Sequence, residues 1–170
     1  MPITTATSED IPSLEELLNS AYRGEGSKKG WTTEADLIEG ELRTDTAALQ
    51  QFMHTPGAIF LKYSGEQGQL EGCVFLHKKQ GKLYLGMLSV SPLIQAKGIG
   101  KQLMAAAENY ARNQQCSSLF MKVVSVRHEL IAWYERKGYS KTGETEPFPA
   151  DGKFGIPMQQ LEFIIMEKKI

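Results

Sequence analysis

The chain has 170 residues, of which 41% are hydrophobic and 23% charged, and its formal net charge is −1. This length and composition are typical of one globular domain, expected over residues 1–170, that buries its core without disulfides or metals. The near-neutral charge argues against a nucleic-acid partner, and no apolar run approaches the ~20 residues that span a membrane.

The first third of the sequence predicts helices. Apolar residues recur at helical spacing over residues 14–21, behind the acidic run Ser8-Glu9-Asp10. The glycine-punctuated run "RGEGSKKGW" then predicts a loop from Arg23 to Trp31. Thr33 with Asp36 predicts the start of a second helix, which would reach about Leu42. A third helix is expected after Asp45, with its end at Thr55-Pro56-Gly57.

From residue 58 onward, segments with strand periodicity predominate. Strands are predicted over 58–64, 70–79, 82–90, 118–126, 139–148 and 161–169, and helices over 98–113 and 128–137. The junction "KKQGK" between two apolar runs favours a hairpin. The order strand, helix, strand around residues 98–113 implies one parallel pair in an otherwise antiparallel sheet. The fold class predicted is therefore mixed α+β.

The thiols and histidines give information about compartment and metals. Cys73 and Cys116 have apolar neighbours and no C-x-x-C partner, which favours two buried thiols over a disulfide. The N-terminus is acidic and lacks the order of a signal peptide. We therefore expect a cytoplasmic protein. The three histidines have no ligand spacing with each other or with the cysteines, so no metal is expected.

The loop after residue 90 has the features of an anion site. A strand ending in "SVSP" leads through Gly98 and Gly100 into a helix, and Lys97 and Lys101 flank the glycines. Main-chain N–H groups and the helix dipole both favour an anion at a helix N-terminus. The alternative is a loop that merely turns the chain into the helix.

Two known phosphate motifs do not fit this loop. The P-loop pattern requires a glycine at Gln95 and a hydroxyl residue at Gln102, and G-x-G-x-x-G fails at Leu103. The spelling that fits is Q-x-x-G-x-G, which resembles the acyl-CoA-binding motif of the GNAT superfamily of N-acetyltransferases. The resemblance implies a central mixed, mostly antiparallel and twisted sheet of about six to seven strands flanked by helices.

The resemblance also implies a set of cofactor-binding residues. In the superfamily the loop amides bind the pyrophosphate of coenzyme A, and the main chain of the preceding strand pairs with the pantetheine arm. That strand is commonly bulged near the thioester, which corresponds here to Met87–Ser89. The side chains of the two strand residues could equally be ordinary core. The set is Leu88, Val90, Gln95, Ala96, Lys97, Gly98, Ile99, Gly100 and Lys101.

A second stretch, "LIAWYERKGY", resembles the other GNAT motif. Tyr134 stands at the family's general-acid position, where a hydroxyl donates a proton to the departing thiolate. The alternative is an amphipathic packing residue. The family often has asparagine and alanine where this chain has Arg127 and Leu130. Arg127 is interpreted either as a contact to cofactor or substrate carboxylate, or as a solvated arginine at a helix start.

The acceptor side of GNAT proteins is normally built from the N-terminal helices and the loop between the last two strands. Arg23, Trp31 and Glu34 are the substrate-binding candidates here, with Thr33 beside them. The alternative places Trp31 in the core and Glu34 at a helix start. Candidates for a base that deprotonates the amine are Glu34, Glu71, Glu129, His77 and His128, or a water molecule.

The function that follows is acetyl transfer from acetyl-CoA to an amine of a small molecule or peptide, without a covalent enzyme intermediate. A homodimer would be common for the superfamily. The alternative function is an acyl-CoA sensor of the same fold without turnover. The sequence does not identify the acceptor amine.

Overall fold

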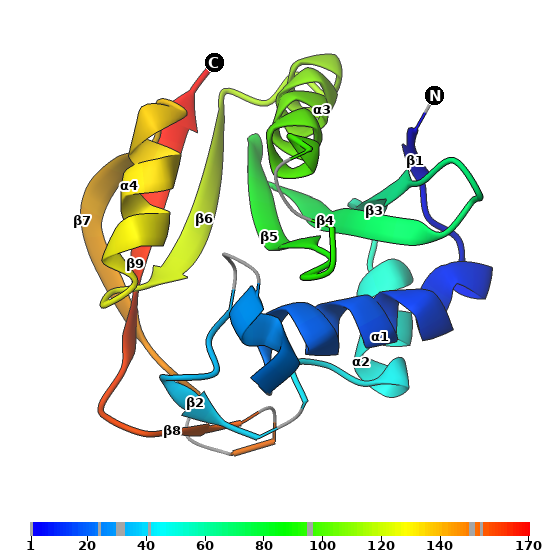
Figure 1. Ribbon diagram of the computed structural model, residues 1–170. Coiled ribbons are helices and arrows are strands. Elements are labelled where there is room, and N and C mark those ends of the chain that lie inside the picture. The colour runs from blue at the N-terminus through cyan, green and yellow to red at the C-terminus, as the bar shows by residue number, and fades with distance from the viewer. Residues whose placement is uncertain are drawn as a thin grey trace.

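The computed structural model describes residues 2–23, 25–29, 33–40, 42–94, 97–149, 152–153 and 155–170. The elements in chain order are β1 (Ile3–Thr5), α1 (Ile11–Tyr22), β2 (Ile38–Glu39), α2 (Thr46–Met53), β3 (Ala58–Ser64), β4 (Leu70–Lys79), β5 (Lys82–Val90), α3 (Ile99–Asn113), β6 (Ser118–Val124), α4 (His128–Arg136), β7 (Ser140–Pro147), β8 (Ile156–Pro157) and β9 (Glu162–Lys169), as Figure 1 shows. Short 3-10 helices lie at Ser8–Asp10 and Glu25–Lys29.

The main sheet has seven strands in the order β1-β3-β4-β5-β6-β9-β7. β5 and β6 pair in parallel, and the other neighbours pair antiparallel. The predicted α+β class, mostly antiparallel sheet and parallel pair around α3 are therefore confirmed. A separate two-stranded sheet joins β2 to β8, so the segment after α1 lies against the loop between β7 and β9.

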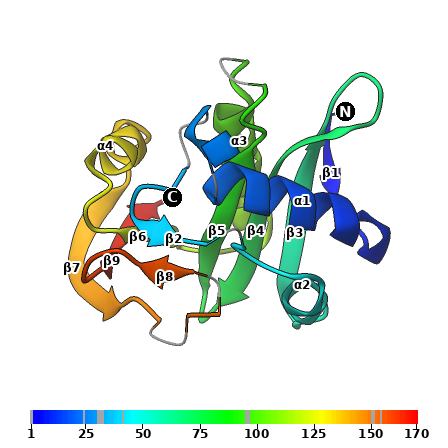
Figure 2. The ribbon, with the colours of Figure 1, turned by 60° about the horizontal axis from the view of Figure 1, so that its bottom comes forward.

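Helices cover both faces of the sheet. Cys73 and Phe75 of β4 belong to a core cluster with α1 and α2, whereas Val74 and Leu76 pack in the cluster that contains α3 and α4. This alternation is the period of two that places successive strand residues on opposite faces. Figure 2 shows α1 crossing β5, β4 and β3.

Most of the predicted elements are present with bounds that differ by at most two residues. The strands 58–64, 70–79 and 82–90 are reproduced. β4 and β5 form the predicted hairpin, and its turn consists of Gln80 at φ 50° and Gly81 at φ 78°. Positive φ at both central residues is expected for a tight hairpin turn. Asp45 caps α2 by accepting a hydrogen bond from Ala48 N. Cys73 and Cys116 are buried free thiols, as predicted.

The helix predicted from Thr33 to about Leu42 is wrong. The chain makes one turn, in which the N–H groups of Leu37 and Ile38 donate to Glu34 O, and then enters β2. A helix of about ten residues, as predicted here, has only marginal stability without tertiary contacts. Gly40 has φ 125°, which cannot continue a helix, and β2 finds a partner in β8.

The parallel pair in the middle of the sheet is short. β5 and β6 pair only at Leu83–Leu119 and Tyr84–Phe120 and then diverge, as Figure 1 shows. The register of β5 against β4 shifts between the pairs Gly86–Phe75 and Ser89–Cys73. This is a β-bulge, and Met87 within it has φ 54°. The sheet therefore opens between β5 and β6.

Among the described residues, no helix has both the length and the apolar character needed to cross a membrane.

Candidate functional site

A cavity of about 250 Å³ lies where β5 and β6 diverge. Its walls come from residues 84–88 of β5 and 121–124 of β6, with Tyr22 of α1 and Tyr134 of α4 also lining it. These elements are distant in sequence, and the short parallel pair brings them together. The cavity is the candidate functional site.

The β5 bulge forms one wall of this cavity. The resemblance implied a bulge at Met87–Ser89, and the structure has one there. Leu88 O accepts a hydrogen bond from the Tyr22 hydroxyl at 2.5 Å, while Met87 O accepts one from Ser89 Oγ at 3.1 Å. The bulge is thus held from α1 and from its own strand. Bulges are frequent next to active sites because they redirect main-chain groups.

Leu88 and Val90 contribute buried side chains to the core cluster beneath α3. Only their main chain is therefore available to a ligand. Ser91 N donates to Glu71 O at 2.8 Å, and Ser89 is paired with Cys73. Because residues of an antiparallel ladder face the partner strand alternately, the main chain of Val90 faces away from β4, toward the opening.

Tyr134 lies on the inner side of α4 and is 6% exposed. Its ring packs edge-on against Trp133 and Tyr139, and the residue lines the cavity opposite the bulge. Burial raises the pKa of the Tyr134 phenol well above its ordinary value. The hydroxyl therefore stays protonated at neutral pH and is a proton donor rather than an acceptor. Packing and an acid role are compatible here.

The N-terminus of α3 follows the end of β5. Gly98 is the N-cap residue at φ 70°, and a side chain there would meet no atom within 4 Å. Lys97 and Lys101 are exposed, whereas Ile99 and Gly100 are buried. Gln95 and Ala96 lie outside the described residues. The predicted cradle thus has a left-handed glycine and two exposed lysines at a helix N-terminus.

Close packing places this helix end beside the strand. A Cβ atom on Gly72 of β4 would lie 2.9 Å from Ile99 Cγ2 and 3.0 Å from Leu103 Cδ1. It would also lie 3.0 Å from the main-chain oxygen of Ser89, so a side chain here would force these neighbours to shift. Glycine at position 72 thereby allows the N-terminus of α3 to lie close against β4.

The acceptor-side candidates form a buried charge network. Arg23 pairs with Oε1 of Glu34, and Arg127 Nη1 lies 3.5 Å from Glu34 Oε2. The side chains of Arg23 and Arg127 are 2% and 9% exposed, so Arg127 is not a solvated arginine at a helix start. Trp31 lies outside the described residues. Thr33 accepts a hydrogen bond from Ala35 N at 3.1 Å, which is a local turn contact.

Of the five base candidates, Glu34 alone lines the cavity among the residues described. Both of its oxygens already face arginines, so it is better suited to holding them in place than to accepting a proton. Cys73 does not line the cavity, and burial raises the pKa of its thiol to about 12, which makes it a poor nucleophile.

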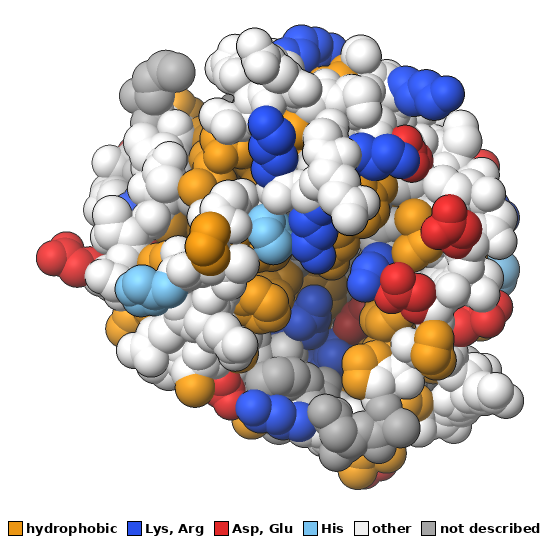
Figure 3. Space-filling view, turned by 180° about the vertical axis from the view of Figure 1, so that it is seen from behind, with side chains coloured by type: hydrophobic (Ala, Val, Ile, Leu, Met, Phe, Trp, Pro, Cys, Tyr) orange, Lys and Arg blue, Asp and Glu red, His pale blue; other side chains and the backbone are white. Residues whose placement is uncertain are grey.

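One cavity residue carried no signal in the sequence. Arg43 lines the cavity, and its guanidinium lies 5.2 Å from the centre of the Tyr22 ring. It belongs to no motif and precedes α2 by only a few residues. Figure 3 shows that Lys and Arg side chains gather in and around a hollow on the face seen from behind.

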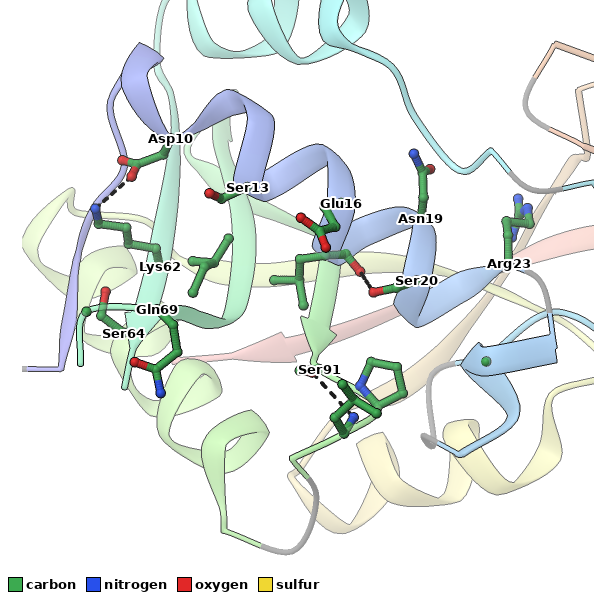
Figure 4. A pocket seen from close by; sticks show the side chains of 16 residues that line it. Asp10, Ser13, Glu16, Asn19, Ser20, Arg23, Lys62, Ser64, Gln69 and Ser91 are labelled. Carbon is green, nitrogen blue, oxygen red and sulfur yellow. Dashed lines mark hydrogen bonds and ion pairs between the residues drawn. The ribbon is translucent and has the colours of Figure 1, made fainter. Parts of the chain in front are cut away.

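A second cavity, of about 660 Å³, lies along α1 beside the β3–β4 turn (Figure 4). Arg23 lines this cavity while its partner Glu34 lines the first, so the ion pair separates the two. Lys62 Nζ in this second cavity is already bound to Asp10 at 2.9 Å. Neither Tyr134 nor the bulge reaches it.

Comparisons with known proteins agree with this geometry. The model of the acetyltransferase (GNAT) family matches residues 11–139. The N-acetylaspartate synthetase of Danio rerio is 26% identical over 130 residues, which are 75% of this chain and 46% of that protein. The chain spans about half the length of the curated relatives it matches.

Solved structures share the fold. The ribosomal-protein-alanine N-acetyltransferase of Brucella melitensis superimposes with a TM-score of 0.73 at 20% identity over 100% of both chains. A Bacillus anthracis protein, assigned as a streptothricin acetyltransferase and solved with acetyl coenzyme A, gives a TM-score of 0.58 at 17% identity. That match covers 71% of this chain and 67% of the other.

Proposed function

Because the chain belongs to the acetyltransferase (GNAT) family, we propose that it transfers the acetyl group of acetyl-CoA directly to an amine. The observation that carries the proposal is the position of Tyr134, a buried and protonated phenol that faces a bulged strand across one cavity. A thioester placed between them would have a proton donor beside its sulfur.

The residues present fit coenzyme A. The exposed Lys97 and Lys101 and the first N–H groups of α3 suit a pyrophosphate, and nothing crowds Gly98. The outward-facing main chain of Val90 suits the amides of pantetheine, which would extend the ladder that β5 and β6 leave open. Structural neighbours support the donor, since one of them was solved with acetyl coenzyme A.

Acetyl-CoA supplies the acetyl thioester, and the chain supplies the groups that let an amine displace the thiol. We assign polarisation of the carbonyl to a main-chain N–H group of the β5 bulge. The Tyr134 hydroxyl then donates its proton to the departing sulfur, the acylated nitrogen releases its extra proton to solvent, and the tyrosine is reprotonated from solvent. The amine must lose a proton before it attacks, and water accepts that proton, because Glu34 is occupied by two arginines.

The test is a measurement of free thiol released from acetyl-CoA across amino acids, polyamines, aminoglycosides, aryl amines and short peptides. Aspartate belongs in the panel because a relative is an N-acetylaspartate synthetase. We expect acetyl-CoA to bind and at least one amine to gain an acetyl group by mass. Acetyl-CoA binding without thiol release from any amine would favour the sensor function instead. A protein that does not bind acetyl-CoA would contradict both.

A further inference from the structure

Resting on the proposed acetyl transfer, we propose that the acceptor is a small amine that also carries a carboxylate, and that Arg43 binds this carboxylate in the cavity between β5 and β6. The proposal follows from the charges that line the cavity, from the way Arg43 is held, and from the size of the space.

The cavity has an excess of positive charge. Among the described residues that line it, the charged ones are Glu34, Arg43, Lys122 and Arg127. Glu34 is shared between two arginines, Arg23 and Arg127. Lys122 Nζ pairs with Glu146 at 2.7 Å. No carboxylate of the described chain pairs with Arg43, so its charge is left for a ligand.

Arg43 is held in place from α1. Asn19 Oδ1 accepts hydrogen bonds from the main-chain N–H groups of Arg43 and Thr44, at 2.5 and 2.9 Å, and Asn19 Nδ2 donates to Thr44 O at 3.2 Å. The guanidinium stacks at 5.2 Å over the ring of Tyr22. Figure 4 shows Asn19 pointing from α1 toward the segment that precedes α2. A guanidinium fixed in this way presents a planar fork that matches a carboxylate.

The positive charge of Arg43 favours some classes of acceptor amine over others. A polyamine or an aminoglycoside would add several positive charges to a cavity whose Arg43 has no carboxylate partner among the described residues, so repulsion disfavours it. A carboxylate on the acceptor removes the excess. Nearby positive charge also lowers the pKa of an ammonium group, which increases the neutral form that attacks the thioester.

The space fits a small acceptor. The cavity measures about 250 Å³, below the roughly 300–1,000 Å³ of sites for drug-sized ligands. Arg43, Tyr134 and the bulge residue Leu88 all line it. A compact molecule with an amine and a carboxylate could therefore reach the reacting thioester and the guanidinium together.

The test uses matched pairs of probes: free amino acids, each with its α-carboxamide, together with β-alanine, its amide and spermidine. Binding to the full chain is measured calorimetrically with coenzyme A present. We expect at least one amino acid to bind about tenfold or more tightly than its amide and than spermidine. Equal affinity for the amides or spermidine, or no amino acid that binds, would overturn the proposal.

Variants assign the effect to the guanidinium. Arg43→Ala should remove the preference for the free carboxylate, and Arg43→Lys should keep part of it because the charge remains while the fork is lost. Arg112→Ala is the control, since Arg112 is exposed on α3 away from the cavity. Acetyl-CoA binding by each variant shows that it is folded. A preference that survives in Arg43→Ala would overturn the proposal.

The same samples separate this proposal from the transfer function. If an amino acid binds with Arg43 dependence and no thiol is released, carboxylate recognition stands and acetyl transfer fails. If amides or polyamines are acetylated as efficiently as amino acids, acetyl transfer stands and the carboxylate-bearing acceptor is wrong.

Discussion

The hydroxyl of Tyr22 donates a hydrogen bond of 2.5 Å to the main-chain oxygen of Leu88, which links the end of α1 to the bulge of β5. Both residues are buried, at 8% and 2% exposure, and both line the cavity between β5 and β6. The contact joins α1, whose C-cap is the acceptor-side candidate Arg23, to the strand that we propose as the wall beside the thioester. It also fixes the main-chain oxygen of Leu88 within the bulge.

Tyr22→Phe should destabilise the protein by about 1–3 kcal/mol, because a buried carbonyl is left without its donor. The bulge should also relax, so we expect kcat to fall while acetyl-CoA binding changes little. Urea unfolding and steady-state kinetics measure the two effects. Tyr110→Phe is the control, because Tyr110 is half-buried on α3 and does not line the cavity. Equal effects of the two substitutions would contradict a special role for Tyr22.

Tyr22 should also make stability depend on alkaline pH. Burial raises its pKa to about 12, whereas the unfolded chain has a tyrosine pKa of about 10. Below pH 10 both states are protonated and the contribution is complete. Between pH 10 and 12 the unfolded state ionises first, so stability falls with a slope approaching about 1.4 kcal/mol per pH unit. The difference in free energy of unfolding between wild type and Tyr22→Phe should therefore become smaller over this pH range. A difference that stays constant would contradict the raised pKa of Tyr22.

The core fold could be predicted from the sequence because its signals are local. The strands 58–64, 70–79 and 82–90 have alternating or continuous apolar residues and are separated by recognisable turns. The sequence of α3 has an apolar stripe at helical spacing and follows glycine residues. Their neighbours in space are also neighbours in sequence. The candidate phosphate loop and the candidate acid Tyr134 could be picked out because each lies in a short motif.

The acceptor side could not be predicted in the same way. Arg43 enters the cavity because Asn19, 24 residues earlier, binds its main chain, and no local pattern encodes that pair. The segment 33–42 looked helical because its capping residues are local, whereas the pairing of β2 with β8 depends on residues more than 100 positions away. Non-local contacts decide this part of the structure.

Tyr134→Phe should lower kcat by roughly 10²–10⁴-fold, because the departing thiolate loses its proton donor. The Kd for acetyl-CoA should change little, since the ring and its packing remain. Tyr110→Phe is again the control, because Tyr110 is half-buried on α3 and does not line the cavity. An unchanged kcat in Tyr134→Phe would exclude the tyrosine as the acid.

Gly98→Val should weaken acetyl-CoA binding more than it destabilises the fold. Gly98 has φ 70°, which a β-branched residue resists, although its side chain would meet no atom. Gly98→Asn should be milder, since asparagine adopts this conformation more readily. Gly143→Val is the matched control, because Gly143 has φ 91° and equal space but lies on β7. It should cost stability without changing acetyl-CoA affinity. The same loss of affinity in both valine variants would show that the α3 cradle is not specific.

Asn19→Ala tests whether α1 positions Arg43. The substitution removes two acceptor contacts and one donor contact to residues 43 and 44. Affinity for a carboxylate-bearing amine should fall about tenfold, as in Arg43→Ala, while affinity for the amide and for acetyl-CoA stays the same. Because Asn19 would act through Arg43, the double variant should be no worse than Arg43→Ala alone. Ser13→Ala, exposed on the same helix, is the control. If Asn19→Ala weakened the amino acid and its amide equally, Asn19 would only support the fold and the preference for a carboxylate would have another origin.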